Sequence, residues 1–566
     1  MKLTDKILAI LACIIAFNFV IFESKAQKFK IIKNSLKAAT KNSFKVVTNA
    51  KIIESAIETQ KYPMPQKALP NMGVLSTTKY INSPNNNNNN NKGIIPNPKN
   101  LHNGKIAPNF INSFNGKNHK ISIHKTTAIN RMMKYIKRTE NRFLNYAKIS
   151  SQSIDTADMN VFPISPGQIK IAEYLENELC GICKGSDATI IRSNDQYVYV
   201  KIPSNIKNKD VPSLMFMAHL DVTPETPAQN IKPIVHYNYD GGDIKLPAGI
   251  VLSPNSPQGT HLKNCKGKTI ITSDGSTLLG ADDKAGVTVL VGAIEIIVKN
   301  KKIKHGDLYF VFSQNEDIGR AADRFEGKYV DGNPDIIIDV DGNMPDKFSV
   351  ENFTASMLNY HFIGHDTHPG DGFVNKYGDA LTAASYFIGQ IDPKKHPSAS
   401  KDKQGYIHCY SMTHPTDSMG KELAEDYLVK VRLRYFDKNE GDTLRQMLKN
   451  AEILTAKAYP FVRIEAGHET MQYENIAYTM YPGTAEIITK SADKYGLKMS
   501  PCSERGGTPS AMMAAKGLRG GPCIYSGQQA AHSVYEWVCV EDMVRMTYVT
   551  ISITKNVADM KKINEN

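Results

Sequence analysis

The chain has 566 residues, enough for two or three domains with a large buried core. Its formal net charge of +13 first suggests a nucleic-acid or anionic membrane partner. The distribution of that charge argues against nucleic acid. Residues 1–128 contain 19 Lys, no Arg and 4 acidic residues, a net +15, which leaves 13 − 15 = −2 for residues 129–566. We therefore expect no nucleic-acid partner for the folded part.

The first 26 residues combine Lys2 and Lys6 with an apolar run over 7–22, which is typical of a signal peptide or signal anchor. We expect localisation in the secretory pathway or attachment to a membrane through residues 7–22, with a cytoplasmic chain as the alternative. Residues 27–126 are rich in Lys, Asn, Ser and Pro, which predicts a low-complexity, disordered segment.

Eight Cys residues are scattered along the chain, and only Cys180 and Cys183 are closely spaced. A zinc ribbon would need a second such pair, and a redox dithiol would open a helix rather than end one. We expect free or packed thiols, with a redox pair as the alternative.

Folded structure is expected from residue 127 onward. Apolar residues at helical spacing predict helices over 129–146, 167–179 and 285–299. Alternating or continuous apolar runs predict a hairpin over 188–202 and strands at 214–218, 269–272, 308–312 and 335–338. Strands that alternate with helices predict an α/β domain with a mixed sheet flanked by helices, and residues 127–348 would form its first part.

The pattern changes between residues 349 and 465. Residues 357–363 and 427–435 alternate like antiparallel strands and 442–456 have helical spacing, which predicts an inserted α+β domain. The first domain would then resume over 466–566, with a helix at 484–495, a strand at 523–525 and a closing helix at 540–557.

Histidine or carboxylate side chains stand beside five of these apolar segments: His219 with Asp221, Asp282, Glu316 with Asp317, Asp341, and His532. Each is ambiguous alone, because an acidic residue also favours a helix start, a solvated loop or a turn, and a histidine can cap a helix. Together they supply what a two-metal hydrolase needs. Such an enzyme requires a bridging carboxylate, terminal His and carboxylate ligands, and a further carboxylate that moves protons.

The same motifs carry a resemblance to a known family. Residues 129–560 resemble the peptidase T branch of the M20 metallopeptidases, a group of tripeptide aminopeptidases. The most specific matches are MAHLDVTPE at 217–225, NYDGGDIKL at 238–246, TLLGADDKAG at 277–286, HGDLYFVFSQNEDIG at 305–319, ERGGT at 504–508 and AHSVYEW at 531–537. The resemblance implies a zinc-peptidase catalytic domain with an inserted lid domain, and short peptides as substrates.

The resemblance also implies two zinc ions per subunit, whose ligands would be His219, Asp282 and Asp341 for one ion and Asp282, Asp317 and His532 for the other. Glu316 would be the general base that activates the attacking water, and Asp221 would orient His219. The mechanism would be hydrolysis of the first peptide bond of a short peptide.

Four further residues match substrate-binding positions of the family. His368 in the lid domain would polarise the scissile carbonyl, while Asn375 and Arg434 of the lid and Arg505 of the catalytic domain would bind the carboxyl end of the peptide. A guanidinium suits a carboxylate because its parallel N–H groups match the two oxygens. A homodimer formed through the lid domain is an alternative to a monomer.

The chain departs from the family pattern at three places. The family has Glu where this chain has Asp317, it has Asp where this chain has Pro509, and its loop after residues 368–370 is longer. We expect altered rather than lost metal affinity, and a reshaped loop beside Arg505. These departures keep two alternatives open: another M20-type dipeptidase or amidohydrolase, and an inactive relative retained as a binding module.

Overall fold

The computed structural model describes residues 123–155, 161–207, 210–417 and 419–563, all of which belong to one compact unit, Asn97–Asn566. The signal peptide or anchor predicted for residues 1–26, and the disordered segment as far as residue 122, lie outside the described residues. The first described helix, α5 (Ile123–Ala147), begins within the last residues of the segment that was predicted to be disordered.

The centre of the catalytic domain is a six-stranded sheet in the order β1-β2-β8-β3-β9-β17. Its strands are β1 (Thr189–Arg192), β2 (Val198–Ile202), β8 (Leu308–Ser313), β3 (Leu214–His219), β9 (Ile336–Gly342) and β17 (Cys523–Tyr525). Strands β8, β3, β9 and β17 are parallel, and β1 and β2 add an antiparallel edge. The predicted mixed sheet with an α/β pattern is confirmed.

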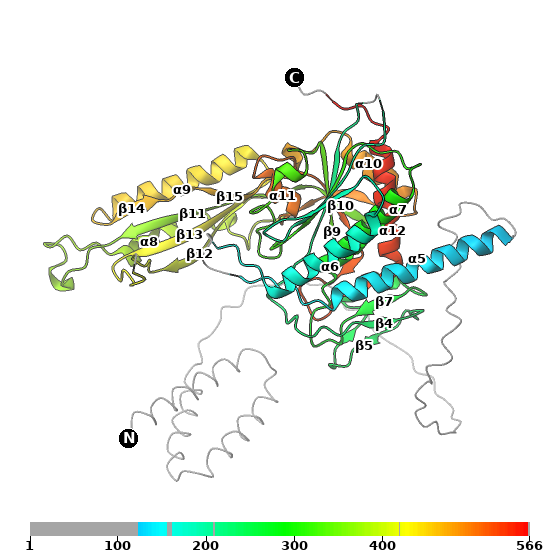
Figure 1. The fold of residues 1–566 in the computed structure, drawn as a ribbon. Coiled ribbons are helices and arrows are strands. Elements are labelled where there is room, and N and C mark those ends of the chain that lie inside the picture. The colour runs from blue at the N-terminus through cyan, green and yellow to red at the C-terminus, as the bar shows by residue number, and fades with distance from the viewer. Residues whose placement is uncertain (1–122, 156–160, 208–209, 418, 564–566) are drawn as a thin grey trace, which may run out of the picture. The chain divides into compact units, whose positions relative to one another are not determined.

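The two faces of this sheet carry different cores, because successive side chains of a strand point to opposite faces. In β3, Leu214, Phe216 and Ala218 pack against the helices of one face. Those helices are α5, α6 (Pro166–Cys183), α7 (Ala281–Lys299), α10 (Thr484–Asp493) and α12 (Val540–Val557) (Figure 1). Met215 and Met217 point to the other face, where they meet α11 (Pro509–Ala514).

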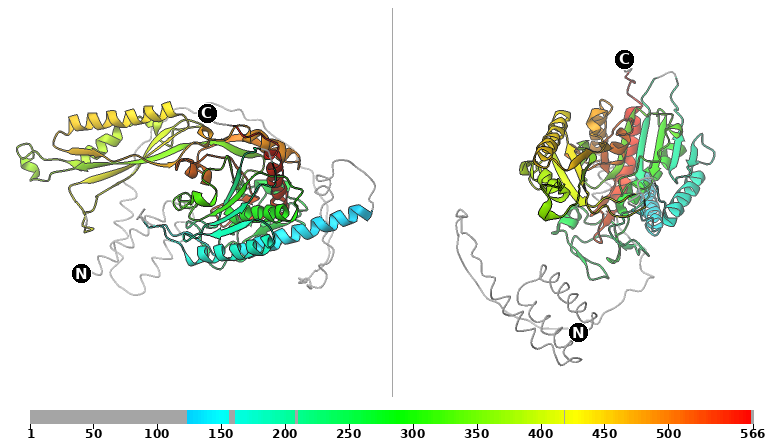
Figure 2. Two further views of the ribbon diagram at one scale, coloured as in Figure 1. Left: turned by 45° about the horizontal axis from the view of Figure 1, so that its top comes forward. Right: turned by 90° about the vertical axis from the view of Figure 1, so that its left-hand side faces the viewer.

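The inserted lid sheet is antiparallel and is built around one long strand, β11 (Thr354–Ile363). Its other strands are β12 (Tyr406–Thr413), β13 (Tyr427–Tyr435), β14 (Arg463–Ala466) and β15 (Thr470–Tyr473). Helices α8 (Ala380–Gly389) and α9 (Lys438–Ala458) cover one face of this sheet (Figure 2). Strand β15 pairs with β11 although it follows residue 465, the predicted end of the lid.

Smaller elements complete the catalytic domain. A four-stranded sheet joins β18 (Gln528–Gln529), β19 (Trp537–Cys539), β7 (Ile270–Thr272) and β4 (Ile234–His236). A hairpin of β5 (Ile244–Lys245) and β6 (Val251–Leu252) and the 3-10 helix η2 (Pro257–Asn264) pack near it. Strands β10 (Lys347–Asn352) and β16 (Ser500–Glu504) form a parallel pair. Further 3-10 turns are η3 (Gly327–Tyr329), η4 (Pro369–Asp371), η5 (Pro393–Lys395) and η6 (Ile476–Tyr478).

Candidate metal centre

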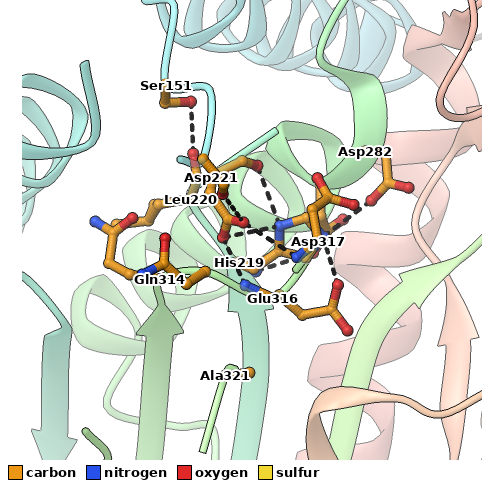
Figure 3. A network of polar contacts seen from close by, with 12 residues as sticks. Ser151, His219, Leu220, Asp221, Asp282, Gln314, Glu316, Asp317 and Ala321 are labelled. Atoms are coloured by element: carbon orange, nitrogen blue, oxygen red, sulfur yellow. Dashed lines mark hydrogen bonds and ion pairs between the residues drawn. The ribbon is translucent and has the colours of Figure 1, made fainter. Parts of the chain in front are cut away.

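Three neighbouring parallel strands, β8, β3 and β9, end beside one another and position the predicted site. His219 is the last residue of β3, Asp341 lies near the end of β9, and Glu316 follows β8. His219, Asp282 and Asp317 point toward one another in the close view (Figure 3). The sequence prediction that these polar residues meet at the carboxyl edge of the sheet agrees with this placement.

The ring of His219 presents its Nε2 atom to the carboxylates. Its Nδ1 atom lies 3.1 Å from the backbone carbonyl oxygen of Asp221, which can only accept a hydrogen bond, so Nδ1 is the donor. Nε2 lies 2.9 Å from Asp282 Oδ1 and 3.7 Å from Asp341 Oδ1. In this tautomer a neutral ring directs its lone pair at Asp282 and Asp341, as a metal ligand requires.

Asp282 lies between the two histidines. Its Oδ1 faces His219, and its Oδ2 is 3.4 Å from Nε2 of His532, a residue in the loop between β18 and β19. The same Nε2 of His532 lies 2.7 Å from Asp317 Oδ1. One oxygen of Asp282 therefore faces each histidine, which is the arrangement of a bridging carboxylate.

The regular part of α7 begins after Asp283, as expected for a helix predicted from residue 285. Helix α7 formally begins at Ala281, but Asp282 (φ −82°, ψ 108°) and Asp283 (φ −116°, ψ 34°) are not helical. The carboxylate of Asp283 accepts hydrogen bonds from the backbone N–H groups of His219 (3.3 Å) and Gly286 (3.0 Å). Adjacent carboxylates thus have separate tasks, and only Asp282 joins the candidate ligands.

The ligand atoms form two groups that share Asp282: His219, Asp282 and Asp341 in one, and Asp282, Asp317 and His532 in the other. Within each group, one ligand atom per residue lies within 4.8 Å of the others. Asp317 Oδ2 is buried and has no hydrogen-bond partner among the described residues. Burial and the nearby Asp282 raise the pKa of Asp317 to about 6 and that of Asp341 to about 8. Two divalent cations fit this set, because they would bind the unpaired Asp317 oxygen and offset the repulsion between the neighbouring carboxylates. Zinc in particular accepts His and carboxylate ligands together.

The role predicted for Asp221, that its carboxylate orients His219, stays a prediction. Its Oδ1 lies 3.5 Å from His219 Nδ1, and the backbone carbonyl oxygen of Asp221 lies 3.1 Å from the same atom. The carboxylate also accepts hydrogen bonds from the backbone N–H groups of Glu316 (3.1 Å) and Asp317 (3.1 Å) and from Ser153 Oγ (2.6 Å). Asp221 therefore holds the turn that carries Glu316 and Asp317, and its backbone holds the histidine.

Sequence reasoning assigned no role to Glu536. Its buried carboxylate accepts hydrogen bonds from the backbone N–H groups of Leu279 (2.6 Å), Gly280 and Asp282 (3.1 Å). Burial and the nearby Asp282 raise the pKa of Glu536 to about 7. It fastens the segment that contains His532 to the loop that contains Asp282. The available signal was an acidic residue directly before the apolar run WVCV at 537–540.

Lys284 was also left without a role. Its side chain is fully buried and donates a hydrogen bond from Nζ to the backbone oxygen of Ile149 at 2.6 Å. Burial lowers the pKa of Lys284 to about 7, although Glu536 and Asp221 oppose the shift. The lysine thus joins the start of α7 to the end of α5.

The predicted substrate residues of the lid loop lie apart from the candidate ligands. His368 directly precedes η4, with 79% of its side chain exposed, and its Nδ1 lies 3.9 Å from a carboxylate oxygen of Asp371. Asn375 is exposed, and its backbone N–H donates to the backbone oxygen of Asp371 at 3.0 Å. Among the described residues, neither contacts the cluster around Asp282.

Arg434 and Arg505, by contrast, both have Tyr406 as a neighbour, Arg434 through its backbone and Arg505 through its side chain. Arg434 is directly opposite Tyr406 in the ladder between β13 and β12, and the guanidinium carbon of Arg505 is 5.8 Å from the centre of the Tyr406 ring. Arg434 is largely buried and donates to Gln472 Oε1 at 2.9 Å. Arg505 is exposed and donates to the backbone oxygen of Asp402 at 2.6 Å.

Pro509, which stands where the family has Asp, lies at the start of a helix. It is the first residue of α11, and Thr508 before it caps the helix by accepting a hydrogen bond from the backbone N–H of Ala511. Proline suits the first turn of a helix, where the missing N–H is not needed. The loop beside Arg505 therefore ends in an ordinary helix start.

The class of two-domain peptide hydrolases combines two features found here. One is a mixed α/β sheet with an inserted antiparallel sheet, and the other is a set of carboxylate and histidine groups at the strand ends. The chain belongs to peptidase family M20/M25/M40, which it matches over residues 274–556. It is 32% identical over 428 residues to Peptidase T of Shouchella clausii, an alignment that covers 75% of this chain and 98% of that protein. It is 33% identical over 423 residues to Peptidase T of Listeria innocua, with 73% and 97% covered.

Solved structures show the same fold. Aminopeptidase PepT from Bacillus cereus superimposes with a TM-score of 0.56 at 18% identity, covering 75% of this chain and 99% of that one. A tripeptidase from Staphylococcus aureus gives 0.55 at 19% identity, with the same coverage. These likenesses confirm the predicted fold class, a zinc-peptidase type catalytic domain with a lid.

The predicted localisation is wrong. The expectation of a secreted or membrane-anchored protein is contradicted by the Peptidase T relatives, which align with this chain over nearly their whole length. Within the part of the chain that the structure describes, no helix is both long and apolar enough to cross a membrane. The apolar run at 7–22, on which the expectation and the predicted membrane attachment rested, lies outside the described residues.

Proposed function

We propose that the chain is a zinc-dependent aminopeptidase that hydrolyses the N-terminal peptide bond of short peptides, tripeptides in particular. The observation that carries the proposal is the convergence of two ligand groups on Asp282, with Glu316 beside them. The Peptidase T relatives, which are matched over 97% or more of their length, support the substrate class. The proposal includes two zinc ions per subunit.

Zinc bound by these groups would supply Lewis-acid activation of the attacking water and of the scissile carbonyl. The chain supplies the proton transfer. Glu316 Oε2 lies 3.8 Å from His219 Nε2, at the centre of the cluster. From there its carboxylate accepts a proton from the attacking water and returns it to the leaving amine.

Other residues keep this geometry fixed. Asp221 holds the backbone of Glu316 and Asp317, and Glu536 holds the backbone of Asp282. Both are buried carboxylates whose oxygens are occupied by backbone N–H groups, so they act as positioning residues and leave proton transfer to Glu316.

Substrate binding is proposed to use His368, Asn375, Arg434 and Arg505. Arg434 and Arg505 supply two guanidinium groups, and a guanidinium suits a free peptide carboxylate. The division into a catalytic domain (127–348 and 466–566) and a lid (349–465), and a homodimer formed through the lid, are parts of the same proposal. Light scattering on the purified protein decides between monomer and dimer.

The test uses the purified full-length chain loaded with zinc and a series of di-, tri- and tetrapeptides with free or amidated carboxyl ends. We expect tripeptides with a free carboxyl end to be preferred. Glu316→Gln is expected to abolish turnover while its zinc content stays at the wild-type value. Glu465→Gln, at a half-exposed site on β14, is the matched control and keeps full activity.

Full activity of Glu316→Gln would refute the assignment of the base. A preference for dipeptides or N-acylated amino acids would favour another M20-type activity. Less than one tightly bound metal ion per chain, with no turnover, would favour an inactive binding relative.

A further inference from the structure

A second group of metal-ligating side chains shares no residue with the candidate centre. One ligand atom each from His261, Cys265 and Asp542 lies within 4.8 Å of the others. Cys539 is a fully buried neighbour of Cys265 in the same packed cluster. The cluster therefore brings together one imidazole, two thiols and one carboxylate.

The four residues come from two short segments, each with metal-ligand spacing. His261 and Cys265 form an H-x3-C pair at the end of η2, and Cys539 and Asp542 form a C-x2-D pair where β19 runs into α12. Two pairs of this spacing, brought together from distant segments, are the pattern of structural zinc sites. Pairing of β19 with β7, the strand that follows η2, brings the segments together.

The contacts leave one oxygen of Asp542 directed at the imidazole. Asp542 Oδ2 lies 2.9 Å from His261 Nε2 and accepts a weaker hydrogen bond from the Tyr525 hydroxyl at 3.4 Å, whereas Oδ1 accepts a hydrogen bond from Lys268 Nζ at 2.9 Å. A carboxylate that binds a metal through one oxygen commonly has its other oxygen held by a neighbouring donor, which is the place Lys268 occupies. The cluster is closed to water, because Cys265 and Cys539 are 0% exposed and Asp542 is 3% exposed.

The charges also balance around a divalent cation. Two thiolates and the Asp542 carboxylate carry three negative charges, and a divalent cation with Lys268 carries three positive charges. The thiol of Cys539 donates a hydrogen bond to Glu541 Oε2 at 3.8 Å, so a carboxylate lies next to the proton that metal binding would displace. A buried ionic group of this size is stable only when its charges are paired in this way.

We propose that His261, Cys265, Cys539 and Asp542 form a structural zinc site, separate from the two-ion centre. The site ties η2 to the start of α12. Residues 530–542, which run from the loop of His532 through Glu536 to this cluster, are then fixed at their far end. The inference does not depend on the proposed peptidase activity.

Cobalt spectroscopy of the full-length chain tests the site. Thiolate ligands to Co²⁺ give an intense near-ultraviolet charge-transfer band, and the candidate centre around Asp282 has only nitrogen and oxygen ligands. We expect apo protein titrated with Co²⁺ to develop this band. The ring of His261 stacks on that of Trp537, the only tryptophan in the chain, with centroids 6.0 Å apart. Cobalt at His261 should therefore quench the tryptophan fluorescence in parallel with the band.

Matched variants assign the signal to its ligands. Cys265→Ser and Asp542→Asn should lose the band and one equivalent of zinc per chain by elemental analysis, and His532→Ala should keep both the band and that equivalent. Cys183→Ser, which removes another buried thiol at the end of α6, is the control and should match the wild type.

The wild-type spectrum decides even if a variant fails to fold. Absence of the thiolate band from wild-type protein, or a wild-type band that persists in Cys265→Ser, would overturn the proposal. A disulfide between Cys265 and Cys539, detected as a mass loss of two hydrogens in protein purified without reductant, would overturn it as well.

Discussion

Replacement of Glu536 by glutamine tests whether one buried carboxylate holds the Asp282 loop. Oε2 of Glu536 faces the N–H groups of Leu279 and Gly280, and Oε1 faces that of Asp282 at 3.1 Å. Glutamine has a single acceptor oxygen, so if this oxygen stays with the first two groups its NH₂ group opposes the N–H of Asp282. The variant loses one hydrogen bond to a charged group and leaves a buried N–H unpaired, which costs about 2–4 kcal/mol. Part of this loss is offset because glutamine removes the buried charge, whose burial raises the pKa of Glu536.

The assay is urea denaturation at pH 8, above the pKa of about 7 that Glu536 has in the fold. Fluorescence of Trp537 reports on the adjacent residue, because Trp537 is the only tryptophan and is fully buried. With a slope of about 3 kcal/mol per M, we expect the midpoint of Glu536→Gln to fall by up to about 1 M. Glu465→Gln, half exposed, should stay within about 0.5 kcal/mol of wild type.

Peptide turnover separates this reasoning from a purely global effect. Glu536→Gln should lose activity in urea concentrations at which circular dichroism still reports a folded chain, because the Asp282 loop loosens first. An unchanged midpoint together with unchanged turnover would refute the role assigned to Glu536.

Three further predictions concern packing and capping. Arg142→Leu removes a buried partner 3.0 Å from Glu295 and should cost about 2–4 kcal/mol in urea denaturation. Burial alone would raise the pKa of Glu295, but its cationic partners outweigh burial and lower that pKa. The ion pair therefore stabilises the fold above pH 4.5, the unfolded value, and this stabilisation is lost as the pH falls below 4.5. Arg142→Leu lacks one of these partners, so it should lose less stability than wild type on acidification. Gly286→Ala would place a Cβ atom 1.9 Å from a backbone oxygen of β9 and should prevent soluble expression. Gly181→Ala in α6 is the control: its Cβ would meet open space, so the melting temperature should change little or rise. Thr508→Ala removes the N-cap of α11 and should cost about 1 kcal/mol, visible as a lower midpoint.

The sequence predicted the long elements well because each has a strong repeat of apolar residues. The helix expected at 540–557 is α12 with the same bounds, and the apolar runs at 214–218 and 308–312 are the buried strands β3 and β8. The two-residue strands β5, β6 and β18 were missed. They are too short to show alternation, and their pairing depends on partners far along the chain.

The site was predictable where a polar residue follows a strong strand. His219 and Asp341 are such residues, and the structure brings them within 3.7 Å. The supporting residues were predictable only in part. Asp221 was singled out beside His219, but Glu536 and Lys284 were not, because they contact backbone groups from segments that only folding brings near, and a local sequence pattern does not show those partners.

The pairing of β17 with β9 has a consequence for how the protein is made. These two strands are neighbours in the sheet, yet the whole lid lies between them in the chain. During synthesis on the ribosome, the edge of β9 therefore remains unpaired until nearly all of the polypeptide has emerged. Premature termination anywhere before the last strand and helix would release a chain with no working cleft and with an exposed β-edge, a species prone to self-association and a natural client for chaperones.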